Sequence, residues 1–368
     1  MYRNNLSPHP LTFATNRPHL PANIIESKNI AGGEVAGRIL LITALLSILV
    51  DAVGKMSAAA EKNDNKIKVV QHCASCGIAG VYDVKLKDCS ACHLVKYCGV
   101  KCQKEHRPRH KKECKKRAAE LKDEILFRQP ESSYLGDCLI CCLPLPIDAS
   151  KSILNQCCSK LFCNGCNYAN KMREIDGRLQ QKCAFCRTNM PTTKEERNEL
   201  VMKRIEANDP LAMSYVGMDR CEEGDYKSAF EYWTRAAALG DVEAHYQLSC
   251  SYRDGQGVEK DEKMALYHAE KAAIAGHPNA RYNLGWTEEQ RGRMDRAAKH
   301  FIIAAKLGHD DSLECVKDLY KAGYVSKEDF AAALRGHHAA VNATKSPQRE
   351  EAYEYISKID DCYRQISY

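Results

Sequence analysis

Between residues 207 and 345, apolar positions recur every three to four residues, the spacing that places them on one face of an α-helix. Three similar phrases occur in this stretch, each with two alanines, two further residues and a glycine, and they end at Gly240, Gly276 and Gly308. Their spacings of 36 and 32 residues indicate an array of helix pairs. We expect each glycine to adopt the left-handed conformation that ends a helix, and the alanines to let neighbouring helices approach closely.

The two ends of the chain carry weaker patterns. Residues 1–68 predict a disordered extension or a short helix, because the apolar run Ile39–Val50 has 12 residues, whereas a membrane span needs about 20. This run also begins too far from the start for a signal peptide. Residues 346–368 predict a C-terminal helix with its apolar residues on one stripe. We expect Trp233 and Trp286 to lie in the core of the repeats.

Composition adds a chemical requirement to this picture. The chain is 44% hydrophobic and only 7% aromatic, which favours small modules and repeats over one large mixed core. It contains 20 cysteines, and most of them lie between Cys73 and Cys186, a clustering that indicates either metal ligands or disulfides. The net charge of +6 is too small to predict a nucleic-acid partner.

The first cysteine cluster has the spacing of zinc ligands. Donors three or four residues apart can reach one ion from a single turn of the chain, and zinc takes four nitrogen or sulfur donors. Thiolates also favour zinc over hard cations. The cluster consists of four such pairs, enough for two tetrahedral sites: Cys73 with Cys76, Cys89 with Cys92, Cys98 with Cys102, and His110 with Cys114.

These residues, with Tyr97, Gln103, His106 and Lys111 between them, resemble a MYND-type zinc finger over residues 73–114. The resemblance implies interleaved sites and a non-ligand role for His106. It also implies a surface that binds short, often proline-containing peptides. A site closed by four protein ligands leaves no position for water or substrate, so hydrolysis at zinc is not expected. The implied ligand sets are Cys73, Cys76, Cys98 and Cys102 for the first zinc, and Cys89, Cys92, His110 and Cys114 for the second.

A second cluster follows and offers eight more thiols for two all-cysteine sites, with Cys142 left over. The order of its pairs resembles a RING-type finger over residues 137–191, in an all-cysteine variant. Two ligands are adjacent in sequence, which leaves a shift of the register by one residue open. The implied sets are Cys138, Cys141, Cys163 and Cys166 for the third zinc, and Cys157, Cys158, Cys183 and Cys186 for the fourth.

The RING resemblance implies a possible surface for a ubiquitin-conjugating enzyme. In that family an apolar residue inside the first ligand pair contacts the conjugating enzyme, and a basic residue after the last ligand hydrogen-bonds to it and to ubiquitin. Ile140 and Arg187 stand at these positions. Such a protein positions another enzyme's thioester and carries no catalytic group of its own.

The repeats resemble Sel-one-like repeats, relatives of tetratricopeptide repeats. The resemblance rests on the loop Asp254–Asp261, with Leu248 and Tyr252 before it and Ala265 and Tyr267 after it. It is clearest over residues 241–276. The unit after this one is four residues shorter, and the last unit is degenerate, as is typical of a cap.

The predicted fold class is therefore multidomain: two small zinc-stabilised α+β fingers followed by an all-α helical-repeat solenoid, after a poorly structured N-terminus. The expected segments are an extension (1–68), a MYND-type finger (69–118), a helical linker (119–136), a RING-like finger (137–191), a linker helix (192–206), repeats (207–345) and a C-terminal helix (346–368).

No catalytic triad, nucleotide-binding loop or paired carboxylates at useful spacing occur in the sequence. The favoured hypothesis is an adaptor that holds four Zn²⁺ ions and binds proteins or short peptides. We expect it inside the cell, in the cytoplasm or the nucleus, because thiolates stay reduced there. The rival hypothesis is a RING-type ubiquitin ligase that recruits its conjugating enzyme through the second finger and its substrate through the first finger or the repeats. Neither nucleic acid nor a membrane is an expected partner.

Overall fold

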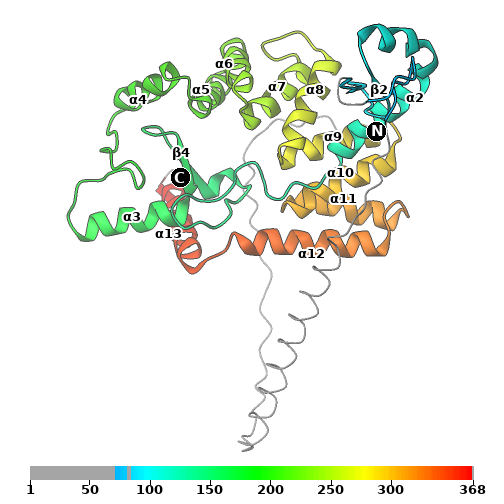
Figure 1. Cartoon of the computed structure of the whole chain (residues 1–368). Helices are drawn as coiled ribbons and strands as arrows, with labels where there is room; N and C mark the ends of the chain where they lie inside the picture. Colours follow the sequence, from blue (N-terminus) through cyan, green and yellow to red (C-terminus); the bar gives the residue numbers. More distant parts are fainter. Residues whose placement is uncertain (1–70, 81–83, 367–368) are drawn as a thin grey trace, which may run out of the picture. The chain divides into compact units, whose positions relative to one another are not determined.

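The structure is a computed structural model that describes residues 71–80 and 84–366 (Figure 1). The predicted extension over residues 1–68, with its apolar run Ile39–Val50, lies outside the described residues. Within the described ranges, no helix combines the length and the apolarity that a membrane crossing requires. The elements follow the predicted order, since two cysteine-rich fingers with little regular structure precede an array of helices.

The first finger contains two short strands and one long helix. Strand β1 (Lys87–Asp88) pairs antiparallel with β2 (Lys96–Tyr97), and helix α2 (Val100–Leu126) follows directly. Helix α2 runs through the boundary expected at residue 118, so the first part of the expected linker continues the finger's own helix.

The second finger is a hairpin followed by a helix. A short 3-10 helix (Ala149–Lys151) leads into β3 (Ser152–Asn155), which pairs antiparallel with β4 (Lys160–Cys163). Helix α3 (Asn164–Asp176) begins where β4 ends. Phe162 is fully buried among the cysteines of this finger, so the metal-ligand candidates themselves make up most of its small core.

Helix α4 (Lys194–Glu206) connects the second finger to the repeats and begins with a capping box. Consecutive repeat helices pack against each other in pairs. The pairs are α5 (Pro210–Glu222) with α6 (Tyr226–Ala238), α7 (Val242–Asp254) with α8 (Glu262–Ile274), α9 (Pro278–Gln290) with α10 (Met294–Lys306), and α11 (Asp310–Lys321) with α12 (Lys327–Ala343). Helix α13 (Pro347–Ile366) ends the described chain.

The repeated glycines adopt the conformation that the pattern predicts. Gly240, Gly276 and Gly308 have φ angles of +89°, +90° and +97°, in the left-handed region that favours glycine. The alanine pairs that precede them are buried, which allows close helix packing. A side-chain cap, such as the Asp241 carboxylate that accepts from the Ala244 N–H at 2.7 Å, then starts the next helix.

The two tryptophans have different environments. Trp233 is 3% exposed and packs in the first repeat core, as predicted. The prediction for Trp286 is wrong, because this side chain is 52% exposed. The buried face of α9 carries Leu284 and Gly285, and the next residue is turned about 100° away from that face.

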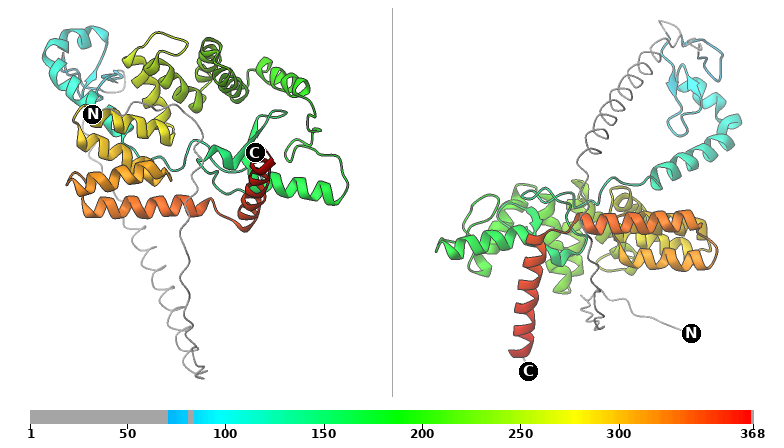
Figure 2. Two further views of the ribbon diagram at one scale, coloured as in Figure 1. Left: turned by 180° about the vertical axis from the view of Figure 1, so that it is seen from behind. Right: turned by 90° about the horizontal axis from the view of Figure 1, so that it is seen from below.

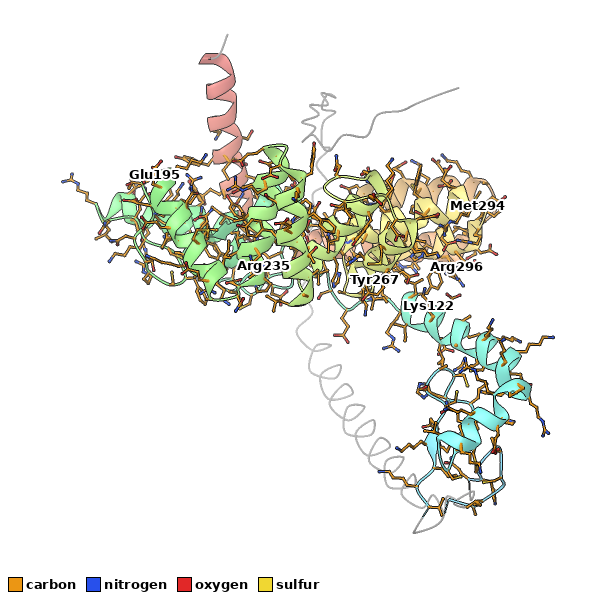
Figure 3. The ribbon with its side chains drawn as sticks, turned by 90° about the horizontal axis from the view of Figure 1, so that it is seen from above. Lys122, Glu195, Arg235, Tyr267, Met294 and Arg296 are labelled. Carbon is orange, nitrogen blue, oxygen red and sulfur yellow. The ribbon has the colours of Figure 1, made fainter. Side chains whose placement is uncertain are left out.

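The end of α2 packs onto the repeats. Leu126 is buried in a core shared with residues of α8 and α9, and the buried Arg281 donates to the Leu126 carbonyl oxygen. Figure 3 shows Lys122 and Arg296 on facing elements near this junction, where Arg296 forms an ion pair with Asp123. The first finger is thus joined to the repeats by a continuous helix with a buried end.

The other end of the array contacts the second finger. The chain turns sharply between α12 and α13 (Figure 2), and α13 packs against α3. Gln348 donates to the Gly165 carbonyl oxygen at 3.1 Å, and the rings of Tyr168 and Tyr355 lie 4.9 Å apart. Residues about 180 positions apart in sequence therefore form one interface.

Candidate metal centres

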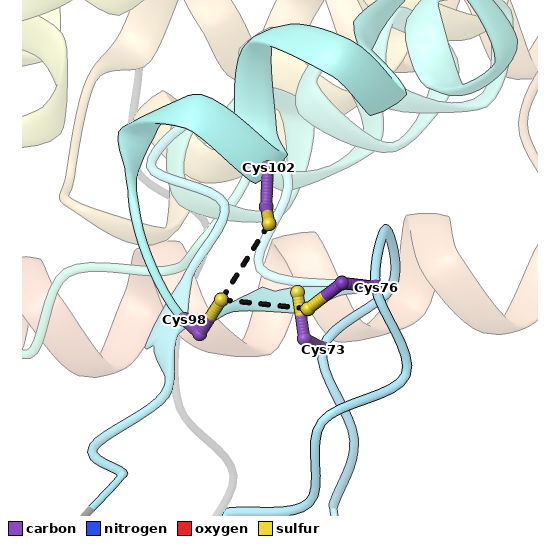
Figure 4. A group of neighbouring side chains, drawn as sticks. All are labelled: Cys73, Cys76, Cys98 and Cys102. Carbon is purple, nitrogen blue, oxygen red and sulfur yellow. Dashed lines mark hydrogen bonds between the residues drawn. The ribbon is translucent and has the colours of Figure 1, made fainter.

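The structure brings the first predicted ligand set together (Figure 4). The sulfur atoms of Cys73, Cys76, Cys98 and Cys102 all lie within 4.8 Å of one another. Cys73 and Cys76 belong to a tight turn closed by the Gly77 N–H, which donates to the Cys73 carbonyl oxygen at 2.9 Å. Cys98 follows β2, and Cys102 lies in the first turn of α2, so four ligand candidates come from three local elements.

The second set gathers around the next turns of the same helix. Cys89, Cys92, His110 and Cys114 form a group with the same spread of ligand atoms. His110 is buried and its Nε2 lies 3.1 Å from the Cys92 sulfur. The first and third pairs along the chain form one group and the second and fourth pairs form the other, so the two groups interleave.

His106 lies beside the second set without joining it. Its ring stacks on that of His110 with centroids 5.6 Å apart, and its Nδ1 lies 3.1 Å from the Tyr97 hydroxyl. The Tyr97 hydroxyl thus contacts the His106 ring, which in turn stacks on the ligand candidate His110. No pattern in the sequence pairs Tyr97 with His106, so this contact appears only in the structure.

The third and fourth predicted sets also form compact groups in the second finger. The Cys163 sulfur caps α3 by accepting a hydrogen bond from the Cys166 N–H. The ligand pair Cys163 and Cys166 therefore lies at the start of this helix. The adjacent Cys157 and Cys158 both belong to one group. The groups are Cys138, Cys141, Cys163 and Cys166, and Cys157, Cys158, Cys183 and Cys186. Cys142 is exposed and belongs to neither.

The geometry of these groups fits zinc. Zn–S bonds of about 2.3 Å in a tetrahedron separate the sulfurs by about 3.8 Å. The Cys89–Cys114, Cys138–Cys166 and Cys158–Cys183 sulfur pairs are each 3.8 Å apart. These distances are far longer than a disulfide bond of about 2.05 Å, and the described cysteines are free thiols.

The thiols of the first set differ in pKa. Burial raises the pKa of Cys73, but N–H donors of Cys76, Cys98 and Ser75 outweigh it and lower that pKa to about 6. Hydrogen bonds with Cys102, Cys76 and Cys73 instead raise the pKa of Cys98 to about 12. A divalent cation bound to all four sulfurs would favour the thiolate form of each.

Ile140 and Arg187 line one shallow hollow on the second finger, together with Asn170 of α3 and Gln348 of α13. Ile140 is 42% exposed. The Arg187 guanidinium donates to the Asn170 Oδ1 at 3.1 Å and lies 3.4 Å from the Glu174 carboxylate. The structure thus brings both residues to the same surface.

The comparisons with known proteins identify two of the modules. The model of the MYND finger family matches residues 73–114, and that of the Sel1 repeat matches residues 210–241, 242–277 and 278–309. The chain therefore contains a MYND finger, a zinc-binding module, followed by Sel1 repeats. The predicted class of two cysteine-rich fingers followed by a helical-repeat array is confirmed.

Two curated relatives match parts of the chain. One is chitin synthase regulatory factor 4 of Schizosaccharomyces pombe, 36% identical over 84 residues, which are 23% of this chain and 13% of that protein. The other is an uncharacterised protein of Neisseria meningitidis, 30% identical over 152 residues, which are 40% of this chain and 32% of that protein. The chain thus spans less than a third of the length of either relative.

Solved structures of repeat proteins are also similar. A Sel1 repeat protein from Oxalobacter formigenes has a TM-score of 0.36 at 22% identity and aligns over 48% of this chain and 52% of its own. A protective antigen of uropathogenic Escherichia coli with an SLR fold has a TM-score of 0.34 at 20% identity and aligns over 53% and 40%.

Proposed function

We propose that this protein is an intracellular zinc-binding adaptor that recognises protein segments through its MYND finger and its repeats. The main support is that α2 is one continuous helix. It supplies ligand candidates to both sites of the first finger, and its last residue, Leu126, is buried in the repeats. A partner bound at the finger would therefore be held in a set orientation relative to a partner bound at the repeats.

The proposal includes four Zn²⁺ ions per chain, with the four ligand sets given above, and the segment boundaries expected from the sequence. The matched spacing of the four groups supports the count. Each set uses four protein donors, which leaves no coordination position for a substrate. The zinc ions are therefore assigned a structural role, and the free thiols support a reducing compartment inside the cell.

Binding of short proline-containing peptides tests the adaptor function. The full chain, loaded with zinc, should enrich a set of related peptides from a displayed library. His110→Ala should abolish this enrichment because it removes a ligand of the second zinc. The matched control Arg109→Ala changes an exposed neighbour on α2 and should leave enrichment intact. Equal enrichment by wild type and His110→Ala would contradict peptide binding by the finger.

A second candidate function, ubiquitin ligation, is favoured by one observation. Ile140 and Arg187, which are 47 positions apart, line the same hollow beside α3. An apolar side chain and a guanidinium with several donors on one surface suit a partner with an apolar contact and exposed carbonyl groups. We propose this surface as a recruiting site for a ubiquitin-conjugating enzyme.

Ubiquitin discharge from a panel of loaded conjugating enzymes tests this second function. Wild-type protein should accelerate discharge, and Ile140→Ala and Arg187→Ala should each reduce the rate while all zinc is retained. Lys160→Ala serves as the control, since Lys160 is exposed on β4 and does not line the hollow. If the wild-type protein does not accelerate discharge from any conjugating enzyme in the panel, the ubiquitin-ligation proposal is contradicted and only the adaptor function remains.

A further inference from the structure

Arg349 belongs to the C-terminal helix α13, but its side chain is buried against the second finger. It is 1% exposed and lies in the first turn of α13, where Pro347 and the Ser346 cap begin the helix. Its guanidinium lies 3.3 Å from the Cys141 sulfur, a member of the third ligand set. More than 200 residues separate the two in sequence.

The guanidinium is held in a fixed orientation. One nitrogen donates to the carbonyl oxygens of Pro144 and Thr344, both at 2.7 Å, and the other donates to the Leu143 carbonyl oxygen at 3.1 Å and to the Cys141 sulfur. Two of these carbonyl groups, those of Leu143 and Pro144, lie two and three residues after Cys141. The Arg349 side chain therefore holds the loop that follows Cys141 and places a positive charge beside the Cys141 sulfur.

Helix α13 reaches this position because Gly165 has no side chain. A Cβ atom at Gly165 would lie 2.8 Å from the Arg349 Cγ and 3.0 Å from its Cα, distances too short for packed atoms. Gly165 directly precedes the ligand candidate Cys166 in α3, so α13 packs against the same turn that carries this ligand candidate. Gln348 adds a hydrogen bond to the Gly165 carbonyl oxygen.

A cation at this position has a specific electrostatic consequence. Four thiolates around one divalent zinc leave a net negative charge, and burying that charge without a partner is costly. Asn155, which donates to the Cys183 sulfur of the fourth set at 3.1 Å, is neutral. At the third set, by contrast, the Cys141 sulfur accepts from the guanidinium of Arg349, which is permanently charged.

We propose that Arg349 is a positioning residue of the third zinc site, which lowers the reactivity of its thiolates and makes zinc retention by the second finger depend on the C-terminal helix. This inference rests on the proposed binding of zinc by the third set. A guanidinium beside a thiolate stabilises the charged, metal-binding form, and partners of metal ligands of this kind typically change metal affinity by 10–100-fold.

The experiment uses the full zinc-loaded chain and two readouts: the zinc count by native mass spectrometry during titration with a chelator, and the rate of alkylation of each cysteine by N-ethylmaleimide. Arg349→Met keeps the length of the side chain without its charge. We expect it to release one zinc at a chelator concentration about 10–100-fold lower than wild type requires. Cys141 and Cys163 should then be alkylated correspondingly faster, while Cys98 and Cys114 of the first finger remain unchanged.

Two further variants separate charge from packing. Arg349→Lys keeps the charge without the forked donors and should restore part of the protection. Gln348→Ala removes the neighbouring hydrogen bond of α13 to Gly165 without touching a ligand candidate, and it should weaken zinc retention much less than Arg349→Met does. If Gln348→Ala weakens the site as much as Arg349→Met does, helix packing rather than the guanidinium protects the site. If Arg349→Lys restores nothing, the positive charge does not protect it. Either result overturns the inference.

The zinc count of wild type distinguishes this inference from the proposed function. A wild-type count of two contradicts the zinc-binding second finger, and the role of Arg349 is overturned with it. A count of four, with equal chelator resistance and alkylation in wild type and Arg349→Met, overturns the role of Arg349 and leaves four-zinc binding intact.

Discussion

The Tyr134 hydroxyl donates a hydrogen bond of 2.5 Å to the Glu243 carboxylate, across 109 positions of sequence. Tyr134 belongs to the segment between the two fingers, and Glu243 begins α7. The same carboxylate lies 3.2 Å from the His277 Nε2, and the rings of Tyr134 and His277 stack with centroids 4.5 Å apart. The backbone N–H of Tyr134 also donates to the Gly276 carbonyl oxygen. The inter-finger segment is thereby held on the repeats at Tyr134, in addition to the buried end of α2 at Leu126.

Removal of the Tyr134 hydroxyl tests how firmly this segment is held. Tyr134→Phe keeps the stacked ring and should raise amide hydrogen exchange in residues 127–136, because a hydrogen bond to a charged group contributes about 1.5–3 kcal/mol. Hydrogen exchange followed by mass spectrometry measures the effect. Ser132→Ala, a change at an exposed position of the same segment, is the control. Unchanged exchange in Tyr134→Phe would show that the ring and backbone contacts alone hold the segment.

The Glu243 carboxylate predicts a pH dependence of stability. Burial raises its pKa, but the hydrogen bond and charge of His277 and the donors Tyr134 and Gln247 outweigh burial and lower it to about 2. The folded state therefore binds the proton less readily than the unfolded state. The resulting stabilisation is complete above pH 4.5 and is lost as the pH falls from 4.5 towards 2.

Glu243→Gln makes this contribution measurable. At pH 7 the variant should be less stable than wild type by on the order of 2–3 kcal/mol, as judged by denaturant unfolding followed by circular dichroism. The difference should shrink once the pH falls below about 4.5. Acid also removes zinc, but it does so in both proteins. A difference that is independent of pH would mean that the charge of Glu243 contributes nothing.

Neighbouring histidines of α2 should respond differently to truncation. His110→Ala removes a ligand candidate and should lose the second zinc, together with the fold of residues 73–114. His106→Ala removes a hydrogen bond to Tyr97 and a stacked ring, at a cost of about 1 kcal/mol, and should keep its zinc. Zinc content by plasma mass spectrometry distinguishes the two. Equal losses in both variants would mean that the ligand register is wrong.

A methyl group on Gly217 should destabilise the first repeat. The added Cβ would lie 2.6 Å from the Trp233 Cδ1, and the indole is held by its hydrogen bond to the Ser214 carbonyl oxygen. Overpacking of this kind costs about 1–3 kcal/mol, more than the roughly 1 kcal/mol that alanine gains over glycine within a helix. Thermal unfolding measures the change.

Gly99→Ala provides the matched comparison. Gly99 has extended backbone with φ of −173°, and an added Cβ there meets no atom within 4 Å. Because Gly99 is the N-cap of α2, where alanine is less favourable than glycine, the unfolding temperature of this variant should fall slightly, and by less than that of Gly217→Ala. A stable Gly217→Ala would mean that Trp233 can move within the repeat core.

Local sequence was sufficient to predict the pairs of ligand candidates and the repeats, whereas the assignment of pairs to sites came from the family resemblance. Cys73 and Cys76 are neighbours on one turn, and His110 and Cys114 face the same side of a helix, so their short spacing already places them together. Gly240 and Gly276 likewise end helices because φ above zero is a property of one residue and its neighbours. Periodicity predicts such elements because its physical cause lies within a few residues.

Other contacts depend on how distant elements pack, and no local pattern indicates them. Trp286 resembles a core residue in the sequence, yet the buried stripe of α9 passes beside it and leaves its ring exposed. Tyr134 meets Glu243 only because the end of α2 is buried in the repeats. Arg349 reaches Cys141 only because the last helix turns back onto a glycine of the second finger. The sequence by itself determined which residues can hold metal and which can form helices. Only the tertiary structure decided which charges and rings face them, because packing joins residues that are one to two hundred positions apart.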